Sequence, residues 1–266
     1  MSFIKCLKCL QCLLGIVFLS LGTSTMAADW QQQLTPTGKL RVGVAYAPKP
    51  TPIFAAKDAA GQVRGVPVDL GQALARELGV PVEMFVAATT AELTEACVEG
   101  RIDVGFMPAD DERRKRLDFS PPYFVIESTF LVAGSTSIQT IAAVNHPDVT
   151  VVGIAGSTTI RAATRSADKA RVIAAKSVDE AMSVMKAGQA QAFALTQDSL
   201  PPLQKELPGS RILPGAFQVT GVAIAVRKNQ PAALEAVSRF VTQAKAQGVV
   251  RRAFDDAGLN NLQIAP

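Results

Sequence analysis

Cysteine is scarce in this chain, and its placement argues against a disulfide-stabilised fold. Four cysteines occur in 266 residues, and three of them, Cys6, Cys9 and Cys12, lie close to the N-terminus. Only Cys97 lies beyond that segment, so no intrachain disulfide is expected once the segment is removed. No Leu-small-small-Cys pattern precedes any of the three, which disfavours a lipid anchor.

Long hydrophobic runs are also missing after the N-terminus. Residues 9–21 (CLQCLLGIVFLSL) are apolar apart from a Gln and a Ser, follow Lys5 and Lys8, and precede a small-x-small site at 25–27. This pattern predicts a secretory signal peptide over residues 1–28, cut after Ala27 or Ala28. The run is shorter than the roughly 20 residues that span a bilayer. We therefore expect a soluble mature protein that is exported to the periplasm.

A strong excess of charge of one sign is absent. Without Lys5 and Lys8, 25 basic residues stand against 23 acidic ones, and the net charge is about +2. A general nucleic-acid binder carries a larger and more concentrated positive charge. No nucleic-acid partner is predicted, and the basic cluster DERRKR at 111–116 is interpreted as local chemistry.

What the sequence does contain is an alternation of strand and helix patterns. Residues 38–48 alternate apolar positions as a strand does, and residues 58–80 contain a glycine-flanked turn and then a helix closed by Gly79. Further strands are predicted at 81–87, 102–107, 129–134, 149–156, 170–175, 190–195 and 221–226, and helices at 89–101, 157–167, 177–188 and 231–259. The alternation predicts an α/β fold with a mostly parallel sheet.

The second set of strands and helices is inserted between two parts of the first. We predict lobe one over residues 29–133 and 220–266 and lobe two over residues 134–219, with the chain crossing near Ala133–Ser137 and near Phe217–Gly221. Two lobes joined by two strands form a hinged cleft, and such clefts are preferred ligand sites.

Six segments resemble, in their order, the solute-binding proteins of ABC importers, family 3, of the polar amino acid class. They are GKLRVGV, GQVRGVPVDLGQALARELGV, EGRIDVGFM, DERRKRLDFSPPYF, VVGIAGSTT and SVDEAMSVMKAGQAQAFAL. The resemblance covers nearly all of residues 38–260. It implies the two-lobed type II periplasmic-binding-protein fold, which closes on a small solute and delivers it to an ABC permease of the inner membrane. Neither lobe indicates an oligomer interface, so we expect a monomer.

The resemblance implies a ligand-binding role for one residue of the basic cluster. In the family, an Arg that follows Glu at a helix start holds the ligand's carboxylate, and the matching residue here is Arg113. A guanidinium pairs with a carboxylate through two parallel hydrogen bonds. The alternative for Arg113 is a structural ion pair with Asp110 or Asp111. Residues 114–116 are interpreted as a solvated helix face, and Phe119 and Tyr123 as packing residues.

A second predicted anion-binding element is the loop GSTT at 156–159, between a strand and a helix. Backbone N–H groups at a helix N-terminus favour an anion. The resemblance implies that Ser157 and Thr158 meet the same carboxylate from the other lobe. The alternative is an ordinary helix cap, because Ser and Thr are favoured there in any case.

The resemblance fails at the residues that would hold an ammonium group. The family places an Asp after the last strand of lobe two, and spacing from Gly188 puts that position at Thr196, with Asp198 two residues later. An ammonium buried without a carboxylate is costly. Either Asp198 or Glu127 takes the role, or the ligand lacks an α-ammonium. The alternative for Glu127 is a solvent-facing position at a strand edge.

Other departures affect the walls of the predicted cleft. Pro108 precedes the Arg113 helix and has no N–H to donate. Residues 47–50 lack the aromatic residue that the family places there, and Tyr46 or Phe54 is the candidate replacement. We favour a small organic anion or a modified amino acid as the ligand. Further cleft candidates are Lys49, Arg161, Gln218 and Thr220.

Two alternative functions stay open. Some proteins of this fold are periplasmic dehydratases, and an acid–base pair here would use Asp110 and Glu127. The sequence has no metal-ligand cluster, no phosphate-binding glycine loop and no Ser-His-Asp set, and its single histidine, His146, lies in a predicted loop. Neither catalysis nor a cofactor is predicted. The second alternative is a free-standing ligand sensor that signals through a separate receptor.

Overall fold

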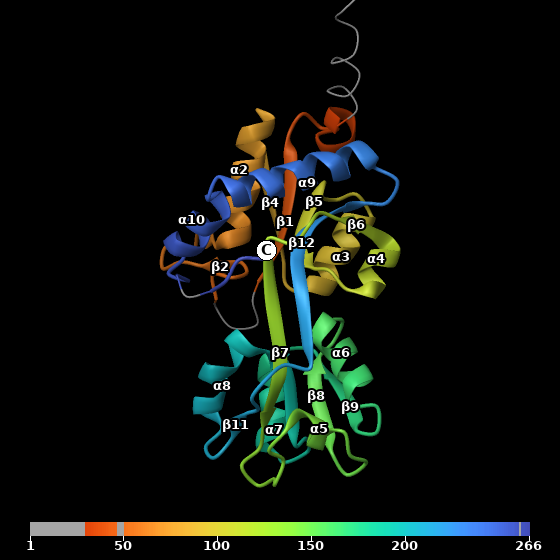
Figure 1. Ribbon diagram of the computed structural model, residues 1–266, viewed down its shortest axis with the longest axis vertical. Helices are drawn as coiled ribbons and strands as arrows, with labels where there is room; N and C mark the ends of the chain where they lie inside the picture. The colour runs from red at the N-terminus through yellow and green to blue at the C-terminus, as the bar shows by residue number, and fades with distance from the viewer. Residues whose placement is uncertain (1–29, 47–50, 261) are drawn as a thin grey trace, which may run out of the picture.

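The computed structural model describes residues 30–46, 51–260 and 262–266, so the predicted signal peptide and Lys49 lie outside the described residues. The chain forms two α/β lobes placed one above the other and joined by two long strands (Figure 1). These strands are β7 (Phe124–Val132) and β12 (Gln218–Arg227). The two-lobed fold predicted from the sequence is confirmed.

Lobe one is built on parallel strands. β1 (Leu40–Ala45) pairs in parallel with β4 (Val82–Ala87) and β5 (Val104–Pro108), as the strand–helix alternation predicts. Its helices are α2 (Val66–Leu78), α3 (Thr90–Val98), α4 (Asp111–Arg116), α9 (Pro231–Ala246) and α10 (Val249–Asp256), and its short strands are β2 (Ala56–Lys57), β3 (Val63–Arg64) and β6 (Leu117–Phe119). The predicted helix that Gly79 closes is α2.

Lobe two repeats this plan. β8 (Thr150–Ile154) pairs in parallel with β9 (Arg171–Ala175) and β10 (Ala192–Thr196). The remaining elements are α5 (Ile141–Val144), α6 (Thr158–Ser166), α7 (Val178–Lys186), the 3-10 turn η1 (Gln197–Ser199), α8 (Leu200–Glu206) and β11 (Arg211–Ile212). One hydrophobic cluster joins α7 and α8 to this sheet, and a second joins α5 and α6 to its other face.

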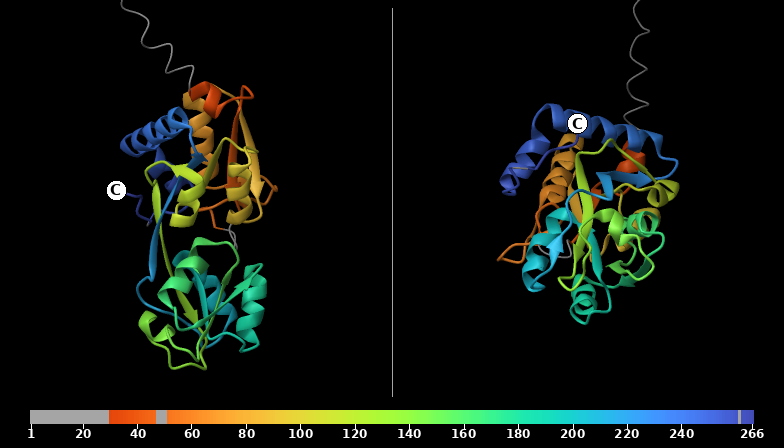
Figure 2. Two further views of the ribbon diagram at one scale, coloured as in Figure 1. Left: turned by 90° about the vertical axis from the view of Figure 1, so that its right-hand side faces the viewer. Right: turned by 60° about the horizontal axis from the view of Figure 1, so that its bottom comes forward.

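Strands β7 and β12 belong to both lobes. Residues 124–128 of β7 pair antiparallel with residues 218–222 of β12, and residues 128–132 continue as the antiparallel partner of β10. The strand order β4-β1-β5-β12-β7-β10-β8-β9 therefore runs through the whole molecule. Figure 2 shows that both strands run along the same side of the molecule.

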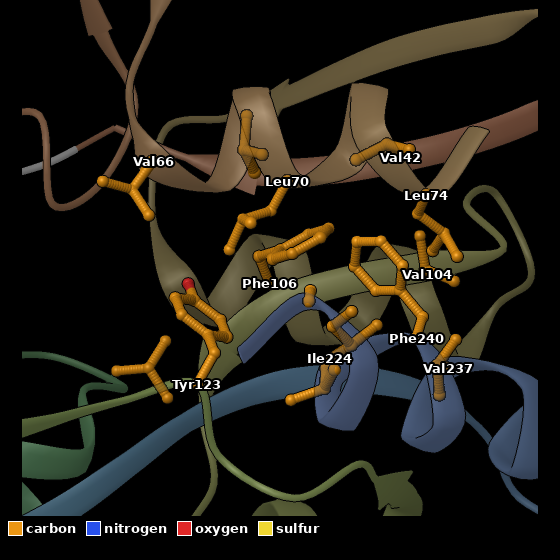
Figure 3. Close-up of a cluster of buried hydrophobic side chains, with 14 of the residues drawn as sticks. Val42, Val66, Leu70, Leu74, Val104, Phe106, Tyr123, Ile224, Val237 and Phe240 are labelled. Atoms are coloured by element: carbon orange, nitrogen blue, oxygen red, sulfur yellow. The ribbon is translucent and has the colours of Figure 1, made fainter. Parts of the chain in front are cut away.

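The core of lobe one lies between its sheet and the helices α2, α9 and α10 (Figure 3). Val42, Val104 and Ile224 point from the sheet toward Leu70 and Phe240 of the helices. The ring of Tyr123 is 2% exposed and meets Phe106 edge-on, with 5.9 Å between ring centroids. The packing role predicted for Tyr123 is confirmed.

The C-terminal helical segment differs from its prediction. The sequence pattern predicts one helix over 231–259, whereas the structure has α9 and α10 separated at Gly248, whose φ is 70°. A left-handed residue of this kind cannot continue an α-helix, and the turn lets α10 pack against α2. Among the described residues, no helix has both the length and the apolar character that a bilayer crossing requires.

The single cysteine of the predicted mature chain allows a test of this core. Cys97 is fully buried on α3, and burial raises the pKa of its thiol to about 12. Because the thiolate is the reactive form, we expect a thiol reagent at pH 8 to modify the native chain about a thousandfold more slowly than the urea-unfolded chain. Absorbance-monitored labelling of residues 29–266 measures both rates. Rapid stoichiometric labelling of the native chain would contradict this packing.

Candidate functional site

A cavity of about 270 Å³ lies between the lobes. Lobe one lines it with Tyr46, Phe54, residues 88–90, Pro108 and Ile126, and lobe two with Ile154, Ala155, residues 157–159, residues 176–179, Leu195 and Thr196. A hollow of about 360 Å³ between α2, α9 and α10 belongs to lobe one alone. We assign the site to the cavity that both lobes line, because only a ligand held there contacts both lobes.

The N-terminus of α6 forms one end of this cavity. Ser157 caps the helix: its Oγ accepts a hydrogen bond from the Ile160 N–H at 3.1 Å and donates one to the Ile154 carbonyl at 2.8 Å. Thr158 begins the helix and is 3% exposed. The capping interpretation is confirmed, and ligand contact by Ser157 and Thr158 stays a prediction. A helix N-terminus carries partial positive charge and can receive an anion.

Arg113 lies directly behind the wall of the cavity. Its guanidinium donates from Nε to Thr94 Oγ1 at 3.0 Å, from Nη1 to the Pro108 carbonyl at 2.8 Å and from Nη2 to the Thr90 carbonyl at 3.2 Å. Each of these acceptors is neutral, and Thr90 and Pro108 line the cavity while Arg113 does not. A guanidinium has five N–H groups, so one N–H on each Nη remains for another acceptor.

The charge of Arg113 is only partly compensated. The side chain is 3% exposed, and burial lowers its pKa to about 10, with the nearby Arg161 lowering it further and Asp110 opposing both. The group therefore stays protonated at neutral pH. The predicted alternative, an ion pair between Arg113 and Asp110, is replaced by a backbone contact, because Asp110 Oδ1 accepts from the Arg113 N–H at 3.0 Å as the cap of α4.

The second carboxylate oxygen of Asp110 binds across the lobes. Arg161 of α6 in lobe two donates from Nε to Asp110 Oδ2 at 2.6 Å, and its Nη2 contacts the same oxygen. Asp110 is 7% exposed and does not line the cavity. Arg113, Arg161 and Asp110 together form a largely buried group with a net charge of +1, at the junction of the two lobes.

The lobes also touch beside this ion pair. Gly156 precedes α6 with φ of 68°, and a Cβ at this position would lie 2.8 Å from Cβ of Ala91 in α3. Real Cβ atoms do not approach so closely, so only glycine allows the backbone of lobe two to come this near to lobe one. The lobes are therefore in contact around the cavity.

Thr196 lines the cavity at the end of β10, the strand next to β8, which leads into α6. It is 8% exposed, and its hydroxyl donates to Ser199 Oγ at 3.0 Å, which in turn donates to Asp198 Oδ2 at 3.2 Å. Burial raises the pKa of Asp198, and the hydroxyls of Thr196 and Ser199 oppose this shift. Asp198 itself does not line the cavity. The structure thus links Thr196 and Asp198 through Ser199, and ligand contact by either residue stays a prediction.

The other predicted residues divide into two groups. Tyr46 lines the cavity, and Lys57 Nζ lies 5.8 Å from the centre of its ring. Glu127 does not line the cavity: it is exposed and pairs with the exposed Val219 of β12, because alternate residues of a strand face opposite sides and Ile126 takes the cavity side. Gln218 and Thr220 also lie outside the wall.

Several wall residues escape prediction from the sequence. Thr89 and Thr90 lie at the start of α3. Lys176 and Ser177 precede α7 and Asp179 lies in its first turn, and all three are exposed. A polar residue at a helix start is equally typical of a cap, so no pattern marks these positions as site residues. The exposed cluster 114–116 behaves as predicted, with Lys115 paired to Glu112 at 2.6 Å and Arg116 to Glu95 at 2.6 Å.

Two α/β lobes that close on a small cavity define the class of two-lobed binding proteins, and comparison with known proteins places the chain within it. The family of bacterial extracellular solute-binding proteins, family 3, matches residues 40–256, and the chain belongs to this family. A glutamine-binding protein of Geobacillus stearothermophilus is 29% identical over 203 residues, which is 74% of each chain. The ABC transporter glutamine-binding protein of Bacillus subtilis (strain 168) is 24% identical over 203 residues, again 74% of each chain.

A solved structure of a binding protein is similar in fold to this chain. The crystal structure of an ancestral amino acid-binding protein, a precursor of cyclohexadienyl dehydratase, superposes with a TM-score of 0.69 at 30% identity. The match covers 88% of this chain and 99% of that one. The predicted family resemblance is confirmed.

The ion pair across the lobes yields a prediction. Asp110→Asn keeps a side chain that caps α4 but loses the charge that holds Arg161, and Arg161→Gln removes the pair from the other lobe. A charge-assisted hydrogen bond contributes about 1.5–3 kcal/mol, so we expect both variants to open the ligand-free lobes. Small-angle X-ray scattering then gives a larger radius of gyration than for the unmodified chain.

Arg165→Gln is the matched control, because Arg165 is exposed on the same helix. It is expected to leave the radius of gyration unchanged. Unchanged values for both Asp110→Asn and Arg161→Gln would show that the ion pair does not hold the lobes together.

Proposed function

We propose that the chain is the periplasmic substrate-binding component of an ABC importer, which captures a small carboxylate-bearing solute in the cavity between its lobes. The solute is amino acid-like or another small organic anion. In this proposal lobe one comprises residues 29–133 and 220–266, and lobe two, residues 134–219, is inserted between them. The chain acts as a monomer and delivers the solute to an inner-membrane permease.

One observation carries the carboxylate assignment: the buried positive charge beside the cavity has no full counter-charge. The carboxylate of Asp110 is paired with the guanidinium of Arg161. Among the described residues, the guanidinium of Arg113 donates only to neutral acceptors. A buried charge without a partner is destabilising. A ligand carboxylate between α6 and the wall at Thr90 and Pro108 would supply the missing negative charge and two acceptor oxygens for the free N–H groups of Arg113.

The remaining walls support a small organic solute. Buried apolar side chains face the cavity from both lobes, namely Phe54, Pro108, Ile126, Ile154, Val178 and Leu195. Hydroxyl groups stand between them, and the charged wall residues, Lys176 and Asp179, are exposed at the rim. This combination of apolar walls with few placed polar groups is typical of small-molecule sites.

Transport rather than turnover is the function that the relatives support. Two relatives are named as glutamine-binding proteins, one of them of an ABC transporter, and the ancestral protein described above is a precursor of a dehydratase. We expect the bound solute to be recovered chemically unchanged. Nuclear magnetic resonance of the solute after prolonged incubation with stoichiometric protein checks this, and a product that accumulates with time would establish an enzyme instead.

A thermal-shift screen of residues 29–266 tests the proposed ligand class. The panel holds amino acids, N-modified amino acids, dicarboxylates, aromatic acids, polyamines and sugars. A ligand at a hundred times its dissociation constant stabilises the native state by about 2.7 kcal/mol, which raises the midpoint by about 5–10 °C in a chain of this size. We expect carboxylates to shift the midpoint and Arg113→Lys to weaken their binding about 10–100-fold, because lysine lacks the planar fork.

Arg114→Ala is the matched control on the same helix, since Arg114 is exposed and its guanidinium lies over Phe119. Each variant is compared with its own ligand-free midpoint, so that a general loss of stability is separated from a loss of binding. Carboxylate binding that persists unchanged in Arg113→Lys would remove Arg113 from the site. A panel in which only neutral or cationic compounds bind would refute the proposed ligand class.

A further inference from the structure

One buried hydroxyl at the junction of the lobes has no hydrogen-bond partner among the described residues. Thr220 of β12 is 4% exposed, and its Oγ1 is buried without a partner. Gln218, two residues away on the same face of the strand, also has a buried oxygen without a partner, so the two side chains do not bond to each other. An unpaired buried hydroxyl is unfavourable. The arrangement of the lobes described above therefore carries a cost at Thr220.

The strand pairing places Thr220 opposite Asp110. β12 and β5 are antiparallel with Val222 opposite Pro108, and a backbone hydrogen bond of 2.9 Å one residue beyond this pair continues the ladder. The next pair in the same register is Thr220 with Asp110. Directly opposite side chains lie on one face of a sheet with their Cβ atoms about 5 Å apart. The Thr220 hydroxyl is therefore within reach of the Asp110 carboxylate whenever one of its oxygens is free.

Both oxygens of that carboxylate are engaged while the lobes are in contact, an arrangement that we call the closed form. Oδ1 of Asp110 accepts from the Arg113 N–H, and Oδ2 accepts from Nε of Arg161 at 2.6 Å. Thr220 is tied to Asp110 by the ladder between β12 and β5, whereas Arg161 lies on α6 of lobe two. Separation of the lobes therefore withdraws Arg161 and frees Oδ2 for the Thr220 hydroxyl.

We propose that Thr220 is a positioning residue that opposes closure of the lobes. Its hydroxyl is unpaired when Arg161 holds Asp110, and it donates to the same carboxylate when the lobes separate. The hydroxyl thus raises the free energy of the closed form and lowers that of the open form. This inference concerns the chain without a bound solute and goes beyond the proposed function, since it does not depend on what the cavity binds.

Removing the hydroxyl while keeping the shape of the side chain tests the proposal. Thr220→Val is expected to shift the equilibrium toward the closed form about tenfold, because it removes one unpaired buried hydroxyl. The sample is residues 29–266, refolded from urea to remove any bound solute. A chain that is mainly open then shows a smaller radius of gyration in small-angle X-ray scattering, and one that is mainly closed shows an unfolding midpoint about 3–5 °C higher. Thr220→Ser keeps a hydroxyl and should match the unmodified chain in both measurements.

Arg161→Ala supplies a background in which the expected sign reverses. Without the guanidinium, Asp110 Oδ2 is free in the closed form as well, so the Thr220 hydroxyl can donate to it in both forms. Thr220→Val then removes a hydrogen bond to a charged group and should lower the unfolding midpoint by about 3–5 °C. A general effect of valine on the strand would have the same sign in both backgrounds.

Thr129→Val is the matched control. Thr129 is fully buried on β7, but its Oγ1 donates to the Leu213 carbonyl at 2.9 Å. This substitution removes a hydrogen bond that is already made and should lower the midpoint in both backgrounds. Circular dichroism verifies that each variant is folded.

Three results would overturn the proposal. The first is a Thr220→Val chain whose midpoint and radius of gyration both equal those of the unmodified chain. The second is a lower midpoint in the unmodified background, as expected for Thr129→Val. The third is a higher midpoint that persists with Arg161→Ala, which would show that the hydroxyl acts independently of Asp110. None of these results bears on the carboxylate ligand, which the thermal-shift screen tests separately.

Discussion

The antiparallel pairing of β7 with β12 is the constraint on which the rest of the structure depends. Each of these strands begins in one lobe and continues into the other, so a single ladder of hydrogen bonds holds both lobes. Relative movement of the lobes must bend this narrow ribbon, because the sheets on either side are fixed by parallel pairing and packed helices. The cavity, the N-termini of α3, α6 and α7 in its wall and the contact between Arg161 and Asp110 all lie where the ribbon brings the lobes together.

Charge is distributed unequally around the cavity. A largely buried group with a net positive charge lies at the junction of α4 and α6, and the half-buried carboxylate of Asp198 lies behind the end of β10. Neither charge is fully compensated within the described residues, and both act on the cavity through intermediate neutral groups. Such placement is unfavourable for the stability of the empty chain, and it is a common feature of sites whose ligand brings the complementary charges.

Residue patterns were sufficient for most of the fold and for part of the site. Apolar alternation and helix spacing predict the strands and helices because each element buries one face, and the loop before α6 follows from its position between a strand and a helix. Whether the side chain of Glu127 faces the cavity or the solvent is not predictable in this way, because the pattern of the segment VIES is compatible with either orientation. Only the neighbouring strands of the sheet determine that Ile126 faces the cavity. The pairing of Asp110 with Arg161 joins residues 51 positions apart. No local pattern encodes such a contact, because it depends on how far the lobes approach.

The contact between Gly156 and Ala91 gives the closing movement a fixed end point. Backbone and methyl group meet there, and neither can be compressed, so the lobes cannot approach one another more closely at this point. The smallest size of the chamber is then set by the chain and not by its contents. A solute that is too small leaves empty space that the lobes cannot take up, and one that is too large keeps them from reaching the stop. Selection by size is thus built into two small residues, Gly156 and Ala91, that do not line the cavity.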